Sequence, residues 1–199
     1  MGVAFMLALM FTYGTIKADQ NEQKARDLND AVKDLDLAKI KSLTPTAQDI
    51  NNEDGLIHAA IMGQRPSIYN NEDGQKFYEI INFLVEKGGD VGQLIDGATA
   101  TPLLNIMMFS KFRPYCKEKW FLNTVSLLGK TAEIVNHQLG NGLTALHMAG
   151  CEELRKLLVK LGANVTIMDN QGRMAADTTK SEYLIKLTHK AYKPALKIN

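Results

Sequence analysis

The segment GLTALHMA, Gly142 to Ala149, decides how the rest of the chain is interpreted. It places His147 three residues after Thr144 and between apolar neighbours, where a histidine can be a general base, a metal ligand or part of the scaffold. The segment that follows, LRKLLVKLGANV (Leu154 to Val165), has apolar residues at helical spacing and then a glycine, Gly162. This pattern predicts an amphipathic helix that ends at a left-handed glycine cap.

Looser copies of this pattern occur before and after it, which indicates internal repetition. EIINFLVEKGGDV, Glu79 to Val91, has the same apolar spacing and places Gly88 where a helix-ending glycine is expected. The opening segment has copies at Ile57–Ala60, Thr101–Leu104 and Gly172–Asp177, and LNDAVKDLDLAKIKSLTPTAQDIN (Leu28 to Asn51) precedes them all. Aligned on His147, the anchors are residues 58, 104, 147 and 177, at steps of 46, 43 and 30 residues.

GLTALHMA resembles the G-x-T-P-L-H-x-A opening of an ankyrin repeat, with Ala145 in place of the usual proline, and the copies resemble further repeats of that family. The resemblance implies an all-α solenoid of about five helix-turn-helix repeats, in which the terminal repeats are degenerate. Because the family period is about 33 residues, the longer steps imply insertions in the second and third repeats. The expected repeats are residues 28–51, 52–91, 96–136, 138–168 and 169–190. Each helix pair leaves an apolar face that only a stacked neighbour can cover.

The resemblance implies that His147 is part of the scaffold, since the Thr and His of this motif open a helix and hydrogen-bond to the neighbouring turns. His58 occupies the corresponding position in an earlier copy. NNEDG, at Asn51–Gly55 and Asn70–Gly74, lacks the ligand spacing of a calcium loop and predicts two β-turns. Neither a zinc-type spacing nor a phosphate loop nor a nucleophile elbow is present. The sequence therefore predicts a non-enzymatic protein with no catalytic residue, cofactor or metal.

The beginning of the chain differs in composition from the rest. Met1 to Ile16 contains no charged side chain, and the apolar run Val3 to Tyr13 is shorter than the roughly 20 residues of a membrane-spanning helix. Such a run is typical of a secretory signal. We expect a signal peptide at residues 1–18 and a periplasmic domain at residues 19–199, with a cytoplasmic fraction if translation starts at an internal methionine. An uncleaved membrane anchor and a helix packed on the fold are the alternatives.

The chain contains two cysteines, Cys116 and Cys151, too few for a disulfide-built fold and without metal-ligand spacing. We favour two separate thiols, and pairing in an oxidising compartment is the alternative. The net charge is −6 in residues 1–100 and +7 in residues 101–199. In an elongated molecule this asymmetry favours electrostatic steering of a protein partner, with scatter on a solvated surface as the alternative. The overall charge of +1 gives no support to nucleic-acid binding.

The two insertions, Gly63 to Gln75 and Ser110 to Phe121, are the segments in which we expect partner binding, because loops on a rigid framework commonly carry function. The second combines aromatic residues with arginine, which dominate interface hot spots. For Trp120, packing into the core is the alternative. The predicted partner-binding residues are Tyr69, Glu72 and Asp73 in the first insertion and Lys111, Phe112, Arg113, Tyr115, Lys117 and Trp120 in the second.

The resemblance implies a binding module whose loop tips and concave inner-helix face contact another protein. With an export signal, the chain is similar to short ankyrin proteins that bacteria send to the periplasm. Some of these are immunity proteins that bind and neutralise a toxic effector enzyme delivered by a rival cell, for instance through type VI secretion. We expect this immunity role for the chain, and we expect it to be a monomer when no partner is bound. We expect it to bind neither nucleic acid nor, once the signal peptide is removed, a membrane. The alternatives are a periplasmic adaptor for a stress enzyme or envelope complex and a cytoplasmic or host-directed adaptor.

Overall fold

The computed structural model describes residues 2–53, 55–63, 71–94, 99–110 and 114–192, with side chains for residues 18–53, 55–63, 71–94, 99–108 and 115–191. These residues form twelve α-helices and one 3-10 helix, η1, and their only β-type pairing is an isolated bridge between Met168 and Met174. The expected all-α class is confirmed. The elements are α1 (Gly2–Lys33), α2 (Leu37–Ser42), α3 (Ala47–Ile50), α4 (Leu56–Gly63), α5 (Asn71–Glu86), α6 (Pro102–Ser110), η1 (Pro114–Lys117), α7 (Lys119–Leu128), α8 (Ala132–Asn136), α9 (Ala145–Met148), α10 (Glu152–Lys160), α11 (Ala175–Thr179) and α12 (Glu182–Tyr192).

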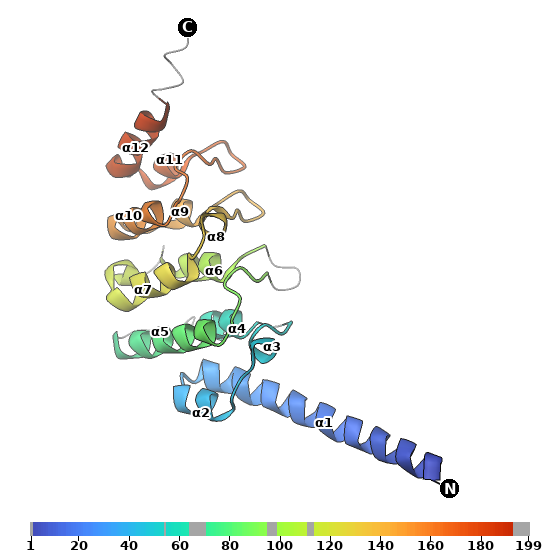
Figure 1. Ribbon diagram of the computed structural model, residues 1–199. Helices are drawn as coiled ribbons and strands as arrows, with labels where there is room; N and C mark the ends of the chain where they lie inside the picture. Colours follow the sequence, from blue (N-terminus) through green and yellow to red (C-terminus); the bar gives the residue numbers. More distant parts are fainter. Residues whose placement is uncertain (1, 54, 64–70, 95–98, 111–113, 193–199) are drawn as a thin grey trace.

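The helices form pairs that are stacked along one axis (Figure 1). The pairs are α1–α2, α4–α5, α6–α7, α9–α10 and α11–α12, and the two helices of each pair are in contact. The first helices contact one another in the order α1, α4, α6, α9, α11, and the second helices do so from α2 through α5 and α7 to α10. The connections that precede α6, α9 and α11 project together on one side of the stack (Figure 1).

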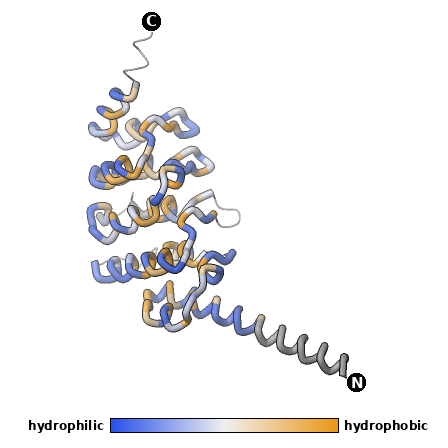
Figure 2. The backbone as a smooth tube through the Cα atoms, viewed as in Figure 1, coloured by the Kyte–Doolittle hydropathy of each residue, from blue (hydrophilic) through white to orange (hydrophobic). Residues whose placement is uncertain are grey.

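The apolar core extends along the whole stack and does not gather at one centre, as the hydrophobic segments in every pair indicate (Figure 2). In α5, the predicted core positions Ile80, Ile81, Leu84 and Val85 are all buried. Of the apolar positions predicted at helical spacing in and after α10, Leu154 and Leu158 are buried, whereas Leu157 and Leu161 are half-buried against the core. Each such side chain contributes about 1.5–3 kcal/mol when fully covered, and the cover comes from the next pair.

The helix α1 is continuous across residue 18, so the expected end of the signal peptide lies inside a helix. Residues 18 to 23 are exposed, and burial begins with the half-buried Lys24. Lys24 Nζ pairs with Asp49 Oδ2 at 2.9 Å, and Leu28, Ala31 and Val32 are buried against the stack. No described helix has the length and apolar content needed to cross a membrane.

An asparagine amide fastens the end of α3 to the turn after α5. Asn51 Nδ2 donates to the carbonyl oxygen of Gly88 (2.9 Å), and Asn51 Oδ1 accepts from the backbone N–H of Asp90 (2.8 Å). Gly88 has a φ of +94°, which confirms the left-handed helix end predicted for it. A Cβ on Gly88 would also lie 3.0 Å from the Cβ of Ala47. The turn therefore requires glycine both for its conformation and for its space.

The same arrangement recurs between α8 and the turn after α10. Asn136 Nδ2 donates to the carbonyl oxygen of Gly162 (3.0 Å), and its Oδ1 accepts from the backbone N–H of Asn164 (2.7 Å). Gly162 has a φ of +99°, and a Cβ there would lie 3.2 Å from the Cβ of Ala132. Two distant parts of the chain thus use one polar link to fix a connecting helix against the turn of the following pair.

The two histidines of the repeated pattern are buried and hydrogen-bonded as scaffold. His147 Nδ1 accepts from the backbone N–H (3.2 Å) and hydroxyl (2.8 Å) of Thr144, and its Nε2 donates to the carbonyl oxygen of Arg173 (3.0 Å). This capping arrangement confirms the predicted roles of Thr144 and His147. His58 Nε2 donates to the carbonyl oxygen of Gln93 (2.9 Å), while its Nδ1 accepts from Asn105 Nδ2 (2.8 Å). Desolvation by burial lowers the pKa of His58, which favours this neutral form.

The turn before α11 closes around the carboxylate of Asp169, whose side chain is 2% exposed. Asp169 Oδ1 accepts from the backbone N–H groups of Gln171 and Arg173, each at 2.9 Å. Asp169 Oδ2 accepts from Arg173 Nε (2.9 Å) and Nη2 (2.7 Å). The side-chain hydrogen bonds from Arg173, assisted by the backbone bonds, lower the pKa of Asp169 to about 2. The charged form of this carboxylate is therefore part of the turn.

Replacing Asn51 with alanine removes two hydrogen bonds to backbone groups, and replacing Asn136 removes three, one of which lies within α8. We expect each variant to lose about 1–2 kcal/mol of unfolding free energy in urea denaturation. Asn123→Ala is the control, because Asn123 lies on α7 and its side chain makes no hydrogen bond within the described structure. It should change stability by less than about 0.5 kcal/mol. Equal losses in all three variants would show that the amide links contribute nothing.

Asp169 makes stability depend on pH in the acidic range. Because its pKa is lower in the folded chain than the usual 3.8, its contribution is complete above about pH 4 and is lost as the pH falls toward 2. Asp169→Asn should therefore be less stable than the parent at pH 7, and the difference should shrink between pH 4 and pH 2. Urea unfolding at pH 7, 4 and 2.5 measures this. A difference that stays constant with pH would contradict the assignment.

Candidate functional site

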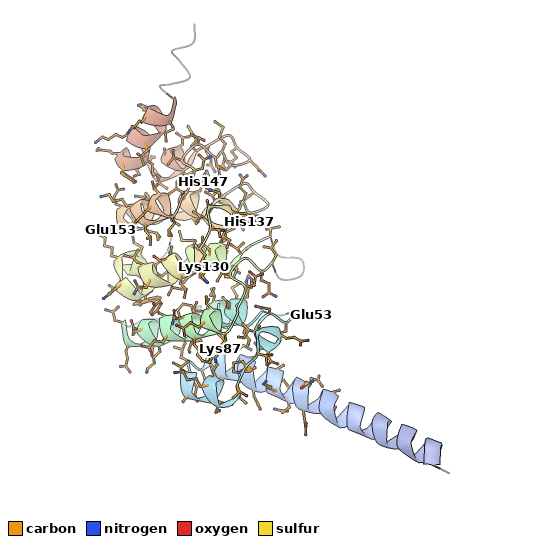
Figure 3. The ribbon with its side chains drawn as sticks, viewed as in Figure 1. Glu53, Lys87, Lys130, His137, His147 and Glu153 are labelled. Carbon is orange, nitrogen blue, oxygen red and sulfur yellow. A yellow bond between two sulfur atoms is a disulfide. The ribbon has the colours of Figure 1, made fainter. Side chains whose placement is uncertain are left out.

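The two segments predicted to bind a partner meet at one edge of the stack. The first leads into α5, and the second contains η1 and the start of α7. In Figure 1, the N-terminal ends of α5 and α7 lie on the side opposite the projecting connections. Figure 3 shows Glu153 on this side and Glu53 and His137 on the other. We call residues 71–76, 115–120 and 151–156 the helix-turn edge.

The centre of the helix-turn edge is built on Trp120. Its side chain is buried, with the residue 5% exposed, and its ring packs edge-on against Phe77 (centroids 6.2 Å apart) and Phe121 (5.6 Å). Tyr115 covers it at a centroid distance of 5.9 Å. Aromatic pairs at these separations add stability beyond the area they bury. The expectation that Trp120 presents its ring to a partner is thus corrected, because it packs into the core and supports the residues above it.

Gly74 joins the two segments by letting α5 approach the indole. Gly74 is buried inside α5, and a Cβ at this position would overlap three atoms of the Trp120 ring. A glycine in the interior of a helix usually costs about 1 kcal/mol relative to alanine, so its presence here indicates a close approach. The packing of Trp120 onto Gly74 therefore connects the pair α4–α5 to the pair α6–α7.

The sequence pattern predicts that Glu72 and Asp73 lie in a loop. The structure instead places both in the first turn of α5. Lys76 Nζ contacts Glu72 Oε1 at 2.8 Å and Asp73 Oδ1 at 3.9 Å, and the hydrogen bond from Lys76 lowers the pKa of Glu72. In the first NNEDG, residues 51–53 lie in a turn, as predicted, and the N–H of Gly55 donates to the carbonyl oxygen of Asn52 (3.0 Å); in the second, residues 71–74 are helical, so the β-turn predicted there is wrong. Acidic residues are favourable at a helix N-terminus, and the contact of Gly74 with Trp120 selects the helix there.

Beside this first turn, the edge has an open hollow of about 560 Å³. Residues from the turn between α1 and α2 form one wall, and Asp73 and Lys76 of α5 form the other; the lining residues are Lys33, Asp34, Leu35, Asp36, Leu37, Asp73 and Lys76. Charges of both signs line it, so it suits a polar or charged side chain of a partner more than an apolar ligand.

Lys117 is the most exposed of the described residues predicted in the second segment. Its side chain is 66% exposed, and its Nζ lies 3.5 Å from Oε1 of Glu153, which is 48% exposed. An ion pair this exposed contributes about 0–1 kcal/mol, so Lys117 can exchange this partner for another at low cost. Tyr115 is half-buried over Trp120 and presents its other side outward. The remaining predicted residues, Tyr69, Lys111, Phe112 and Arg113, lie outside the described residues.

The structure joins Cys116 to Cys151 by a disulfide, with the two Cα atoms 6.0 Å apart. The favoured expectation of two separate thiols is therefore wrong. Cys116 lies in η1 and Cys151 is the N-cap residue of α10, so the bond connects the pairs α6–α7 and α9–α10. The separation of 35 residues is close to the family period of about 33, although the repeat step at this point of the sequence is 43. Residues about one period apart lie side by side in a stack, which is the signal that the sequence offered.

The described histidines and acidic residues do not converge on a reactive centre. Within the described ranges, no group of three His, Cys, Asp or Glu residues is placed to hold a metal ion. His137, outside the scaffold pattern, has its Nε2 2.9 Å from the carbonyl oxygen of Thr99 and so fastens a connection. What the helix-turn edge offers is a rigid, charged and partly aromatic surface.

Gly74→Ala should lower stability, because the new methyl group overlaps the indole of Trp120. Overpacking costs about 1–3 kcal/mol and outweighs the gain of about 1 kcal/mol in helix propensity. Trp120→Leu alone should lose about 2–4 kcal/mol from the core. In the double variant the clash is absent, so its loss should be smaller than the sum of the two single losses by about 1 kcal/mol or more. Additive losses, measured by urea unfolding, would contradict this contact.

Comparisons with known proteins do not extend this description. No protein-family model matches the chain, and no curated protein matches it in sequence. The function is therefore argued from the residues and their geometry.

Proposed function

We propose that this chain is an exported ankyrin-type protein that binds another protein through its helix-turn edge. The partner that we infer is a toxic effector enzyme, which the chain neutralises as an immunity protein. The observation that carries the proposal is that Trp120 and Gly74 bring two segments, chosen from the sequence as partner-binding, onto one rigid edge. A rigid surface lowers the entropy lost on binding, which is what a tight inhibitor requires.

The stacked helix pairs and their turns support the ankyrin-type assignment. Thr144 and His147 form the helix-opening cap of that family's motif, and Gly88 and Gly162 end second helices in the left-handed conformation. The first helix α9 has only four residues, all buried, and so depends on its neighbours for stability. These are the features that the resemblance of GLTALHMA to an ankyrin repeat led us to expect.

Two observations support export. Disulfides persist in oxidising compartments such as the periplasm, and both cysteines of the chain form one. Residues 18 to 23 of α1 are exposed, and the pairing of α1 with the rest of the fold begins at Lys24. Cleavage after residue 18 would therefore leave Lys24, Leu28 and the other described contacts of this helix in place.

The charge distribution supports a charged protein partner. Residues 1–100 have a net charge of −6 and residues 101–199 a net charge of +7, and the stack separates these halves along its axis (Figure 1). The helix-turn edge crosses the boundary between them, with Glu72 and Asp73 on one side and Lys117 and Lys119 on the other. Such an arrangement orients an approaching partner and raises the association rate.

The function is tested by determining whether the reading frame beside this gene encodes a secreted enzyme and by purifying that enzyme. We expect the purified chain, without its first 18 residues, to bind that enzyme at a one-to-one ratio and to abolish its activity. Co-expression in the periplasm should protect cells from the enzyme. Binding without inhibition would favour the adaptor alternative, and absence of binding would contradict the proposal for that enzyme.

The surface is tested by reversing the charge of Lys117. Lys117→Glu should slow association with the enzyme about tenfold at low salt. The double variant Lys117→Glu with Glu153→Lys restores the internal ion pair. It should still associate as slowly as the single variant, because the partner meets a negative charge at position 117 in both variants. Surface plasmon resonance at two salt concentrations measures both rates.

Lys160→Glu is the matched control, since it makes the same change in net charge at the exposed C-terminal end of α10. It should leave the association rate within about twofold of the parent rate. An equal effect at positions 117 and 160 would mean that only the total charge matters and would place the contact away from the helix-turn edge.

A further inference from the structure

We propose that the disulfide between Cys116 and Cys151 is a redox-sensitive clamp on the helix-turn edge. Oxidised, it holds residues 114–118 in the conformation that binds the partner; reduced, it releases them. This inference rests on the proposed function, because it concerns the regulation of that same surface. It implies that the binding surface is complete only in an oxidising compartment.

The clamp acts on the segment between α6 and α7. Cys116 lies between Tyr115 and Lys117, two of the residues predicted to contact the partner, and its only covalent tie to the next helix pair is Cys151. The described non-covalent ties are weaker. Glu118 N–H donates to the carbonyl oxygen of Tyr115 (2.8 Å), which closes the 3-10 turn on itself and does not fix it to α10.

Across the gap to α10, the described ion pair of this segment joins Lys117 to Glu153, and both side chains are largely exposed. Solvent screens such a pair, so it does not hold a loop by itself. Tyr115 rests on Trp120, within its own helix pair, and Cys116 is packed in the core. The disulfide is therefore the strongest described tie between residues 114–118 and α10.

The two sulfur atoms differ in accessibility, which makes the bond open to exchange. Cys116 is buried at 7% exposure, whereas Cys151 is half-buried. A dithiol can attack Sγ of Cys151, form a mixed disulfide there and release the thiolate of Cys116. The second sulfur of the dithiol then displaces Cys151, so that two electrons and two protons pass from the dithiol to the protein disulfide. A disulfide-bearing oxidant reverses both steps.

The geometry also keeps the reduced pair ready to close again. In the oxidised structure, Cys151 Sγ also lies 3.1 Å from the carbonyl oxygen of Cys116. Cys151 is held at the N-terminus of α10, so one of the two sulfurs stays in place when the segment that carries the other is released. Breaking the bond should therefore free the segment that contains Cys116 and leave α10, which contains Cys151, in place. A disulfide that only stabilised the whole fold would affect both elements alike.

Hydrogen exchange measured by mass spectrometry on the full folded domain tests the clamp without any partner. After reduction by dithiothreitol and alkylation, peptides that cover residues 114–121 should exchange about tenfold faster or more, whereas peptides within residues 77–86 of α5 should change by less than about twofold. Trp120, the only tryptophan, should report the same change by fluorescence. Unchanged exchange at 114–121, or a uniform increase in all helices, would overturn the proposal.

The variant Cys116→Ser with Cys151→Ser is the control. It should exchange hydrogen like the reduced chain both with and without dithiothreitol. If that variant does not fold, reduced and alkylated parent protein serves instead. In the second arm, the enzyme that the oxidised chain binds is titrated with both forms, and we expect the reduced form to bind at least about tenfold more weakly. Equal affinity of the two forms would overturn the regulatory inference and leave the proposed function intact, while absence of binding by either form would count against the proposed function alone.

Discussion

The fold depends on one constraint: no helix pair can cover its own apolar side, so each must bury that side against the next. The pair α9–α10 shows this most clearly, because α9 has four residues and every one of them is buried. Its cover comes from α6 on one side and α11 on the other. The apolar side chains of successive pairs therefore form one continuous core along the stack.

Polar links decide how the pairs are aligned, and thereby which residues share an edge. Apolar packing alone tolerates sliding, whereas the bonds of Asn51 to Gly88 and of Asn136 to Gly162 require one register. Buried His58 and His147 act in the same way, because each ring ties a first helix to the connection that follows. The His58 and Asn51 links meet at one turn, since Gln93 accepts from His58 through its carbonyl oxygen and donates to the carbonyl oxygen of Asn51 through its side chain (3.2 Å). These polar links fix the register of the pairs on which the helix-turn edge is built.

Local patterns in the sequence predicted the features that depend on local structure. The helical spacing in α5 and α10, the glycines that end them and the capping role of His147 all follow from residues within one helix and its turn. The features that the sequence analysis did not predict depend on contacts between different helix pairs. Residues 71–74 of the second NNEDG are helical and lie against Trp120 of the next pair, and the stack places Cys116 beside Cys151. The assignment of Trp120 to the surface failed for the same reason, since its burial is decided by Phe77 on another helix.

The helix-turn edge also explains why a binding surface can be built from few residues. Trp120 supplies the apolar foundation, and Tyr115 above it is left free to present its outer side. The ion pair between Lys117 and Glu153 is exposed and weak. A partner that offers Lys117 a stronger ion pair can therefore replace Glu153 at little cost in free energy. The disulfide beneath them fixes the backbone before the partner arrives, so the ordering cost is met during oxidation and not during binding. In the proposed role, this transfer of the ordering cost to an earlier covalent step allows a short segment to bind tightly.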